Sequence, residues 1–169
     1  ADVYSTEARD ITLKFDAAGV ERVASHTGSG WEALSYDFTG AMPADQTKIA
    51  FFNDLSQQGD GTDAWTIYID NLAQSTGGDT GGTDPEPPVS ATIALPVDFE
   101  EAADAYEIAG FDGGVASVEA GPDGAVSLKY VKGAGQNWAG VWINLDTAVD
   151  SANGEVMTAD VYSTEARDI

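Results

Sequence analysis

Short runs of alternating apolar and polar residues, separated by Gly, Asp and Asn, are the feature that most restricts the fold of this chain. In "ITLKF" and "GVWINL", apolar side chains recur at every second position, the period of a strand with one buried face. Helical patterns are poor throughout. We expect strands over residues 2–4, 11–15, 21–25, 32–37, 48–53, 66–70, 93–99, 105–108, 116–119, 125–130, 140–145 and 154–163. Strands at this spacing predict an all-β fold, an antiparallel β-sandwich (jelly roll) of two sheets.

The composition excludes several classes of protein. The chain of 169 residues has no cysteine and one histidine, His26, so we expect no disulfide framework, thiolate nucleophile or multi-histidine metal site. Its 29 acidic and 7 basic residues give a net charge of −22, which opposes binding to nucleic acid or to a membrane surface. The same acids offer oxygen ligands for a hard cation such as calcium.

Residues 73–92, "AQSTGGDTGGTDPEPPVSAT", have the composition of a flexible linker. Each flank alone holds too few strands to cover both faces of a sheet. We therefore interpret residues 1–72 as the C-terminal half of a β-sandwich module and residues 93–169 as the N-terminal half of one.

The segment "ADVYSTEARDI" occurs twice, at residues 1–11 and at residues 159–169. If modules repeat in tandem, this segment joins the two halves, and a module runs from residue 93 to 158 and continues from residue 1 to 72. The chain is then a window cut from identical repeats or an engineered circular permutant. Its halves pack on each other, or on neighbouring chains in a head-to-tail or strand-swapped assembly. In both cases we expect one copy of the segment to fill the junction.

In module order, the segments "VDFE", "YVKGAGQNWAGVWINL", "ADVYSTEARDITLKFD", "GWEALSYDFTG", "KIAFFND" and "TIYIDNL" resemble those of β-sandwich modules attached to secreted marine bacterial polysaccharide-degrading enzymes. Such modules are similar to the jelly-roll carbohydrate-binding modules of the family-4 and family-6 type. The resemblance implies a non-catalytic, extracellular module that binds a polysaccharide, such as an algal β-glucan, for an attached enzyme. It also implies a structural calcium ion that ties the first strand to the last.

The residue types also favour a calcium site. Calcium takes six to eight oxygen ligands from segments that the fold brings together. The segment "VDFEE" offers Asp98, Glu100 and Glu101, and "GDGTDAWTIYIDN" offers Asp60, Asp63 and Asp70. The resemblance implies that Glu100 and Asp70 are side-chain ligands, and Asp98 is the next candidate. The alternative is that these are solvated acids in a chain rich in them.

Sugar recognition needs flat aromatic faces together with polar groups for the hydroxyls. If Val141 and Ile143 face the core, Trp142 and Asn144 face outward, and the same alternation turns Lys14 and Tyr68 outward. We predict a binding platform that is formed by Trp142, Tyr68, Lys14, Asn144 and either Tyr4 or Tyr162, with Trp138 on a nearby loop. The alternative is that Trp138 and Trp142 close the ends of the sandwich core.

Catalysis is not expected, since no carboxylate pair stands out and His26 has no accompanying nucleophile motif. A second class of function stays open, namely a calcium-rigidified repeat or spacer module of a surface adhesin. An acidic surface and identical repeats would suit it equally well, but a spacer needs no outward aromatic row.

Overall fold

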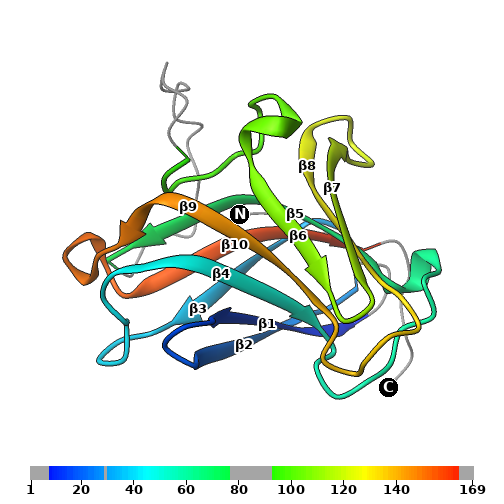
Figure 1. The fold of residues 1–169 in the computed structure, drawn as a ribbon, viewed down its shortest axis with the longest axis horizontal. Coiled ribbons are helices and arrows are strands. Elements are labelled where there is room, and N and C mark those ends of the chain that lie inside the picture. The colour runs from blue at the N-terminus through cyan, green and yellow to red at the C-terminus, as the bar shows by residue number, and fades with distance from the viewer. Residues whose placement is uncertain (1–7, 29, 77–92, 164–169) are drawn as a thin grey trace.

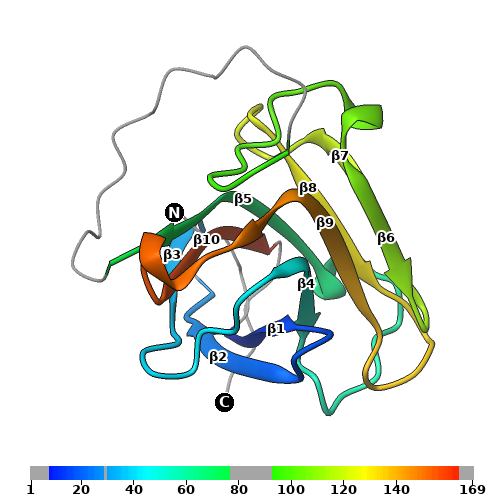
Figure 2. The ribbon, with the colours of Figure 1, turned by 60° about the vertical axis from the view of Figure 1, so that its left-hand side comes forward.

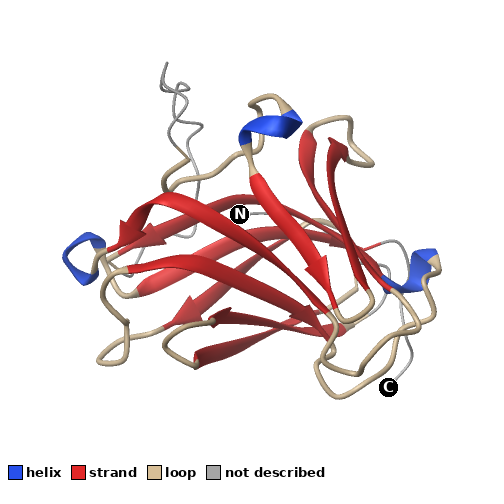
Figure 3. Ribbon diagram, in the orientation of Figure 1, coloured by secondary structure: helices blue, strands red, loops and turns tan. Residues whose placement is uncertain are grey.

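The computed structural model describes residues 8–28, 30–76 and 93–163, which form an all-β sandwich (Figures 1 and 3). The predicted fold class is thus confirmed. The strands are β1 (Arg9–Phe15), β2 (Val20–His26), β3 (Glu32–Asp37), β4 (Gln46–Asn53), β5 (Thr66–Ser75), β6 (Glu107–Phe111), β7 (Gly114–Ala120), β8 (Val126–Lys132), β9 (Gly140–Val149) and β10 (Val156–Ser163). Short 3-10 turns occupy Asp63–Trp65, Ala103–Ala105 and Ser151–Asn153.

The strands form two five-stranded sheets, in the orders β2-β1-β4-β9-β6 and β3-β10-β5-β8-β7. All the strand pairs are antiparallel. Strands from the two halves of the chain lie next to each other in both sheets, since β4 pairs with β9 and β5 pairs with β8 and β10 (Figure 2). The two halves therefore complete one sandwich within this chain.

Strand alternation explains the core. On β1, Ile11, Leu13 and Phe15 are fully buried between the sheets, while the intervening Asp10 and Lys14 are on the other face. The same period buries Val141 and Ile143 of β9. Both of these predicted runs lie on inner strands of one sheet, with the alternation that is expected for half-buried strands.

One predicted strand is wrong, and another is shifted. Residues 93–99 contribute only an isolated bridge, in which the backbones of Val97 and Leu72 exchange hydrogen bonds. Pro96 cannot donate to a ladder, which explains why regular pairing does not extend along this segment. The strand expected at 105–108 begins at Glu107, because the preceding residues form a 3-10 turn. The strand expected at 2–4 lies outside the described residues.

The two copies of the duplicated segment are used in different places. Residues 159–163 of the second copy belong to β10, whereas Arg9, Asp10 and Ile11 of the first copy begin β1 in the opposite sheet. The expectation that a single copy fills the junction is therefore wrong, because each copy supplies a different part of it. The remainder of the two copies, residues 1–7 and 164–169, lies outside the described part of the chain.

Candidate functional site

The outer face of the sheet β2-β1-β4-β9-β6 brings together Lys14 and Trp142, as their outward parity predicted. Lys14 is paired in register with Ala50 of β4, and Ala50 is paired with Trp142 of β9. On its other side Trp142 is paired with Ala109 of β6. The indole is half-buried, and Ala50 on the same face is only 2% exposed, so larger neighbours cover it. Small residues on both sides leave room for the indole to lie across the sheet surface.

Two phenylalanines add to this face. The rings of Phe52 and Phe111 meet edge to face, with centroids 5.6 Å apart. Gly140 allows this contact, because a Cβ built there would lie 2.5 Å from Cζ of Phe111. Phe111 is paired in register with Gly140, two residues before Trp142 on β9. The absence of a side chain at Gly140 thus lets the Phe111 ring lie over β9.

Two lysines flank the aromatic rings. Nζ of Lys48 lies 4.1 Å from the centroid of the Trp142 ring, and Nζ of Lys14 lies 6.0 Å from that of Phe52. Lys48 is paired in register with Asn144, so the predicted Asn144 lies beside this lysine. We define the outer face as Lys14, Lys48, Phe52, Phe111, Trp142 and Asn144.

Trp138 lies in the loop between β8 and β9 and is 50% exposed. Its Nε1 donates a hydrogen bond of 2.9 Å to Oδ2 of Asp112, in the turn after β6. That turn directly follows Phe111, so the Trp138 loop lies at the end of the outer face. Neither Trp138 nor Trp142 belongs to the core, and the alternative that they close the ends of the core is wrong.

The structure does not bring Tyr68 to the outer face. Tyr68 lies on β5, in the opposite sheet, and is only 9% exposed, with Lys129 across from it in the register. Its predicted place beside Lys14 and Trp142 is wrong, because strand alternation turns a residue outward without saying on which sheet. Tyr4 and the side chain of Tyr162 lie outside the described residues.

Lys48, Phe52 and Phe111 were missed by the sequence analysis. Lys48 and Phe52 lie two residues on either side of Ala50, so the alternation of β4 could have turned them outward together. Phe111 gives no such signal, because it ends a short strand and reaches the outer face across Gly140.

The remaining tryptophans have other places. Trp65 is 4% exposed and lies under the guanidinium of Arg9, whose Cζ is 4.3 Å from the ring centroid. Arg9 also forms an ion pair of 2.7 Å with Asp54. Trp31 is half-buried and lines a hollow on the opposite sheet.

That hollow is acidic and contains one of the predicted calcium ligands. It has a volume of about 340 Å³ and is lined by Trp31, Asp70, Asn71, Asp123 and Asp160. Asp70 and Asp160 are paired in register on β5 and β10, and both are at most 9% exposed. Nδ2 of Asn71 donates a hydrogen bond of 2.6 Å to Oδ2 of Asp160.

Burial raises the pKa of Asp70 to about 7, and the nearby carboxylates of Asp98, Glu100 and Asp123 raise it further. The three predicted ligands, Asp70, Asp98 and Glu100, are thus electrostatic neighbours. The hydrogen bonds between Leu72 and Val97 explain this, because they hold the segment that carries Asp98 and Glu100 against the end of β5.

The donor chemistry suits a hard cation, since carboxylate oxygens dominate the hollow. Within residues 8–28, 30–76 and 93–163, however, no three Asp, Glu or His side chains converge closely enough to hold a metal ion. Asp123, Asp160 and Asn71 were not predicted at this site. Asp160 belongs to the duplicated segment, and the apolar residues next to it in sequence predicted a strand and did not indicate a metal site.

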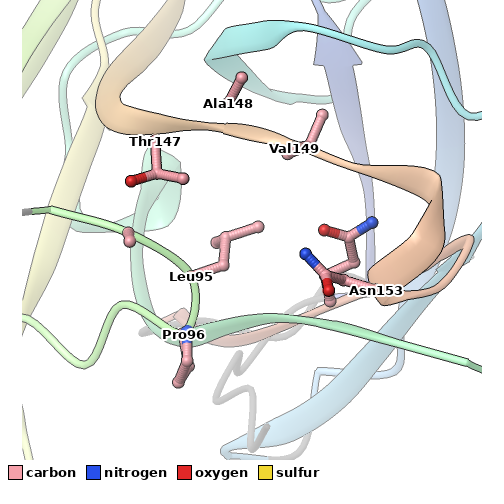
Figure 4. A pocket seen from close by; sticks show the side chains of 8 residues that line it. Leu95, Pro96, Thr147, Ala148, Val149 and Asn153 are labelled. Atoms are coloured by element: carbon pink, nitrogen blue, oxygen red, sulfur yellow. The ribbon is translucent and has the colours of Figure 1, made fainter.

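A second hollow, of about 250 Å³, lies at the end of β9 between Thr147, Val149 and the segment with Leu95 and Pro96 (Figure 4). Its lining is aliphatic and amide-bearing, with Gln74 and Asn153 as the larger polar side chains. The lining has no titratable side chain, so this hollow offers no chemistry comparable to the outer face.

No family model, curated protein or solved structure matches this chain. Within the described part of the chain, none of the helices has the length and apolar character that a membrane span requires.

Proposed function

We propose that this chain is a non-catalytic carbohydrate-binding module, which binds a polysaccharide on the outer face and keeps an attached extracellular enzyme close to it. The observation that carries the proposal is the placement of Trp142 between two alanines, beside Lys48 and Asn144. An indole offers a flat surface to a sugar ring, and a sugar that stacks on the face covered by the Lys48 ammonium displaces that group, which can then bond the hydroxyls together with the amide of Asn144.

The shape of the face favours this function over catalysis. The Trp142 ring is only half-buried, and the side chains around it come from four strands, β1, β4, β9 and β6. A broad sheet surface suits a chain of sugars that lies across it. The nearest carboxylates in register, Glu21 and Glu107, are on the two edge strands, β2 and β6, and are not positioned as an opposed pair across Trp142.

The calcium ion is part of the proposal. Asp70, Asp98 and Glu100 are the residues that would hold it, and their carboxylates would have to move closer together than they are in this structure. Asp160 and Asp123 lie in the same neighbourhood. A cation there would offset the repulsion among these carboxylates and would tie the segment of Val97 to β5. Because a bound ion stabilises only the folded state, chelation is expected to lower the melting temperature by several degrees. An unchanged melting curve in excess EDTA would refute the calcium site.

The test of the binding function is Trp142→Ala, measured by glycan array and by titration calorimetry on the glycans that bind. We expect a wild-type Kd of about 10 µM to 1 mM, because a solvated glycan gains little per contact. The variant should lose binding and keep nearly all of its melting temperature, because the ring lies outside the core.

Trp65→Ala is the matched control. Trp65 is 4% exposed, so its truncation should cost about 3–5 kcal/mol of stability. If Trp142→Ala destabilises the chain as much as Trp65→Ala, or if it binds glycans as well as the wild type does, the proposed platform is wrong. The spacer module of an adhesin would then be the better proposal.

A further inference from the structure

The two lysines of the outer face differ from the other cationic side chains of the molecule. Among the described residues, the ammonium groups of Lys14 and Lys48 make no hydrogen bond and no ion pair, and each is near an aromatic ring instead. This is unexpected in a chain with 29 acidic and 7 basic residues, where a carboxylate partner is seldom far away.

The other described cations all have oxygen partners. Arg9 pairs with Asp54 and Lys129 pairs with Glu119. Lys132 is fully buried and donates to three backbone carbonyls, and Arg22 donates to the carbonyls of Glu21 and Asp37. Among the cations that the structure describes, only Lys14 and Lys48 keep their donors available to a ligand.

The central strands of the sheet carry no carboxylate in this region, and the carboxylates in register with Lys14 and Asn144 are Glu21 and Glu107 on the edge strands β2 and β6. Their outward side chains around Trp142 are Thr12, Lys14, Lys48, Ala50, Phe52 and Asn144. Lys14 and Trp142 lie in one row, two strand spacings or about 10 Å apart. Lys48 lies diagonally next to Trp142 on the neighbouring strand.

The Lys48 ammonium lies over the Trp142 ring, so a sugar that stacks on that face displaces it, and the displaced ammonium can then bond the same sugar. The next part of the same glycan would approach Lys14. Ammonium groups bond anionic oxygens more strongly than neutral hydroxyls. We infer that the outer face binds a polysaccharide that carries carboxylate or sulfate groups, with Lys48 of β4 and Lys14 of β1 pairing to those groups on the same side of the Trp142 contact. This inference rests on the proposed carbohydrate-binding function.

The net charge of −22 repels an anionic ligand at long range, so the affinity for such a ligand should depend on the salt concentration in a distinctive way. In 0.15 M salt, exposed charges more than about 8 Å apart are largely screened, while at 0.01 M the screening length is about 30 Å. We therefore expect binding to strengthen as the salt is raised from about 0.01 to 0.15 M. A basic protein would show the opposite trend.

The experiment is titration calorimetry of the intact chain in 0.15 M NaCl with three probes of similar length. These are oligogalacturonate, which carries carboxylates, sulfated carrageenan oligosaccharide, and neutral laminarin oligosaccharide. We expect at least one anionic probe to bind about tenfold more tightly than laminarin oligosaccharide. Which anionic probe binds identifies the group as carboxylate or sulfate.

Three variants locate the effect. Lys14→Gln and Lys48→Gln should each weaken anionic binding about three- to fivefold, the range of an exposed ion pair, and the double variant should weaken it about tenfold or more. Lys129→Gln removes a cation from the opposite sheet and should leave binding unchanged. Melting temperatures of all the variants show that they are folded.

Two results would overturn the inference. If laminarin oligosaccharide binds as tightly as the anionic probes and the lysine variants bind as the wild type does, the preference for anions is wrong. The proposed function survives in that case, provided that Trp142→Ala abolishes binding. If the folded chain binds none of the three probes or any glycan of the array, the proposed function fails together with the inference.

Discussion

The duplicated segment allows an unusually well-matched test of the fold. Ile11 of the first copy is fully buried in β1, and Ile169 is the same residue of the second copy, preceded by the same ten residues. We predict that Ile11→Ala strongly destabilises the chain and that Ile169→Ala does not. Each variant is the control for the other, because the composition change is identical.

The magnitude follows from the burial. Truncating Ile11 to Ala removes three carbons from a side chain that is 0% exposed, which costs about 2.4 kcal/mol at about 0.8 kcal/mol per buried carbon. The cavity left between the sheets adds to this, so the total is about 3–5 kcal/mol. For a chain of this size, each kcal/mol lowers the melting temperature by about 2–4 °C, so a loss of roughly 6–20 °C is expected.

The assay is thermal unfolding followed by circular dichroism, supported by urea midpoints. Val161 and Val3 form a second matched pair, in which the buried residue belongs to the second copy. Val161→Ala should lower the melting temperature and Val3→Ala should not. Together, the pairs test whether the second copy supplies β10 and the first supplies β1.

The result that would refute this reasoning is a small loss for both single variants of a pair and a large loss for the double variant. A large loss only in the double variant Ile11→Ala, Ile169→Ala would show that either copy can fill the same place in the sheet. A large loss for Ile169→Ala alone would mean that the second copy, and not the first, begins β1.

Three further predictions concern single residues. Lys132→Met should lower the free energy of unfolding by about 3 kcal/mol or more, because it leaves the carbonyls of Asn53, Asp54 and Asn137 without their donor. Lys129→Met removes a partly exposed ion pair with Glu119 and a contact with the Tyr68 ring, and it should cost under about 1 kcal/mol in urea titrations. Gly140→Ala should displace the Phe111 ring, which would lie 2.5 Å from the new Cβ, and should weaken glycan binding in calorimetry; unchanged binding would exclude Phe111 from the site. In EDTA, the wild-type chain should become more stable as the pH falls from 8 to 5. The pKa of Asp70 is about 7 in the folded state and 3.8 in the unfolded chain, so the folded state binds the proton more tightly. Asp70→Asn should reduce the gain in the free energy of unfolding between pH 8 and pH 5 by about 2 kcal/mol relative to the exposed control Asp16→Asn. An equal dependence on pH in both variants would contradict the assignment to Asp70.

Strand alternation predicted much of the fold and part of the outer face. It placed Lys14, Trp142 and Asn144 outward and their neighbours in the core, because a period of two fixes the face of each residue once its neighbours are apolar. It could not place Tyr68, since the choice of sheet depends on strand order, which is set by long-range pairing. Phe111 could not be predicted for a different reason, because the position of its ring over β9 depends on the absence of a side chain at Gly140, on another strand.

The acidic hollow illustrates the same limit. Asp70, Asp98 and Glu100 were chosen from two segments far apart in sequence, and the bridge between Leu72 and Val97 explains why they are neighbours. Asp160 lies opposite Asp70 only because β10 pairs with β5, and the residues around Asp160 in sequence do not indicate that it belongs to an acidic site. The pairing of strands and segments far apart in sequence therefore decides which acids lie close together, and local sequence patterns do not encode this pairing.

The outer face also depends on both halves of the chain. Lys14, Lys48 and Phe52 come from β1 and β4 of the first half, and Trp142, Asn144 and Phe111 come from β9 and β6 of the second. The contact between Lys48 and Trp142 exists only where β4 pairs with β9. If identical modules follow one another in a longer chain, a first half can pair with either neighbouring second half and build the same face. The proposed glycan binding then requires correct pairing of the halves, and we expect it not to depend on whether the linker or the duplicated segment connects them.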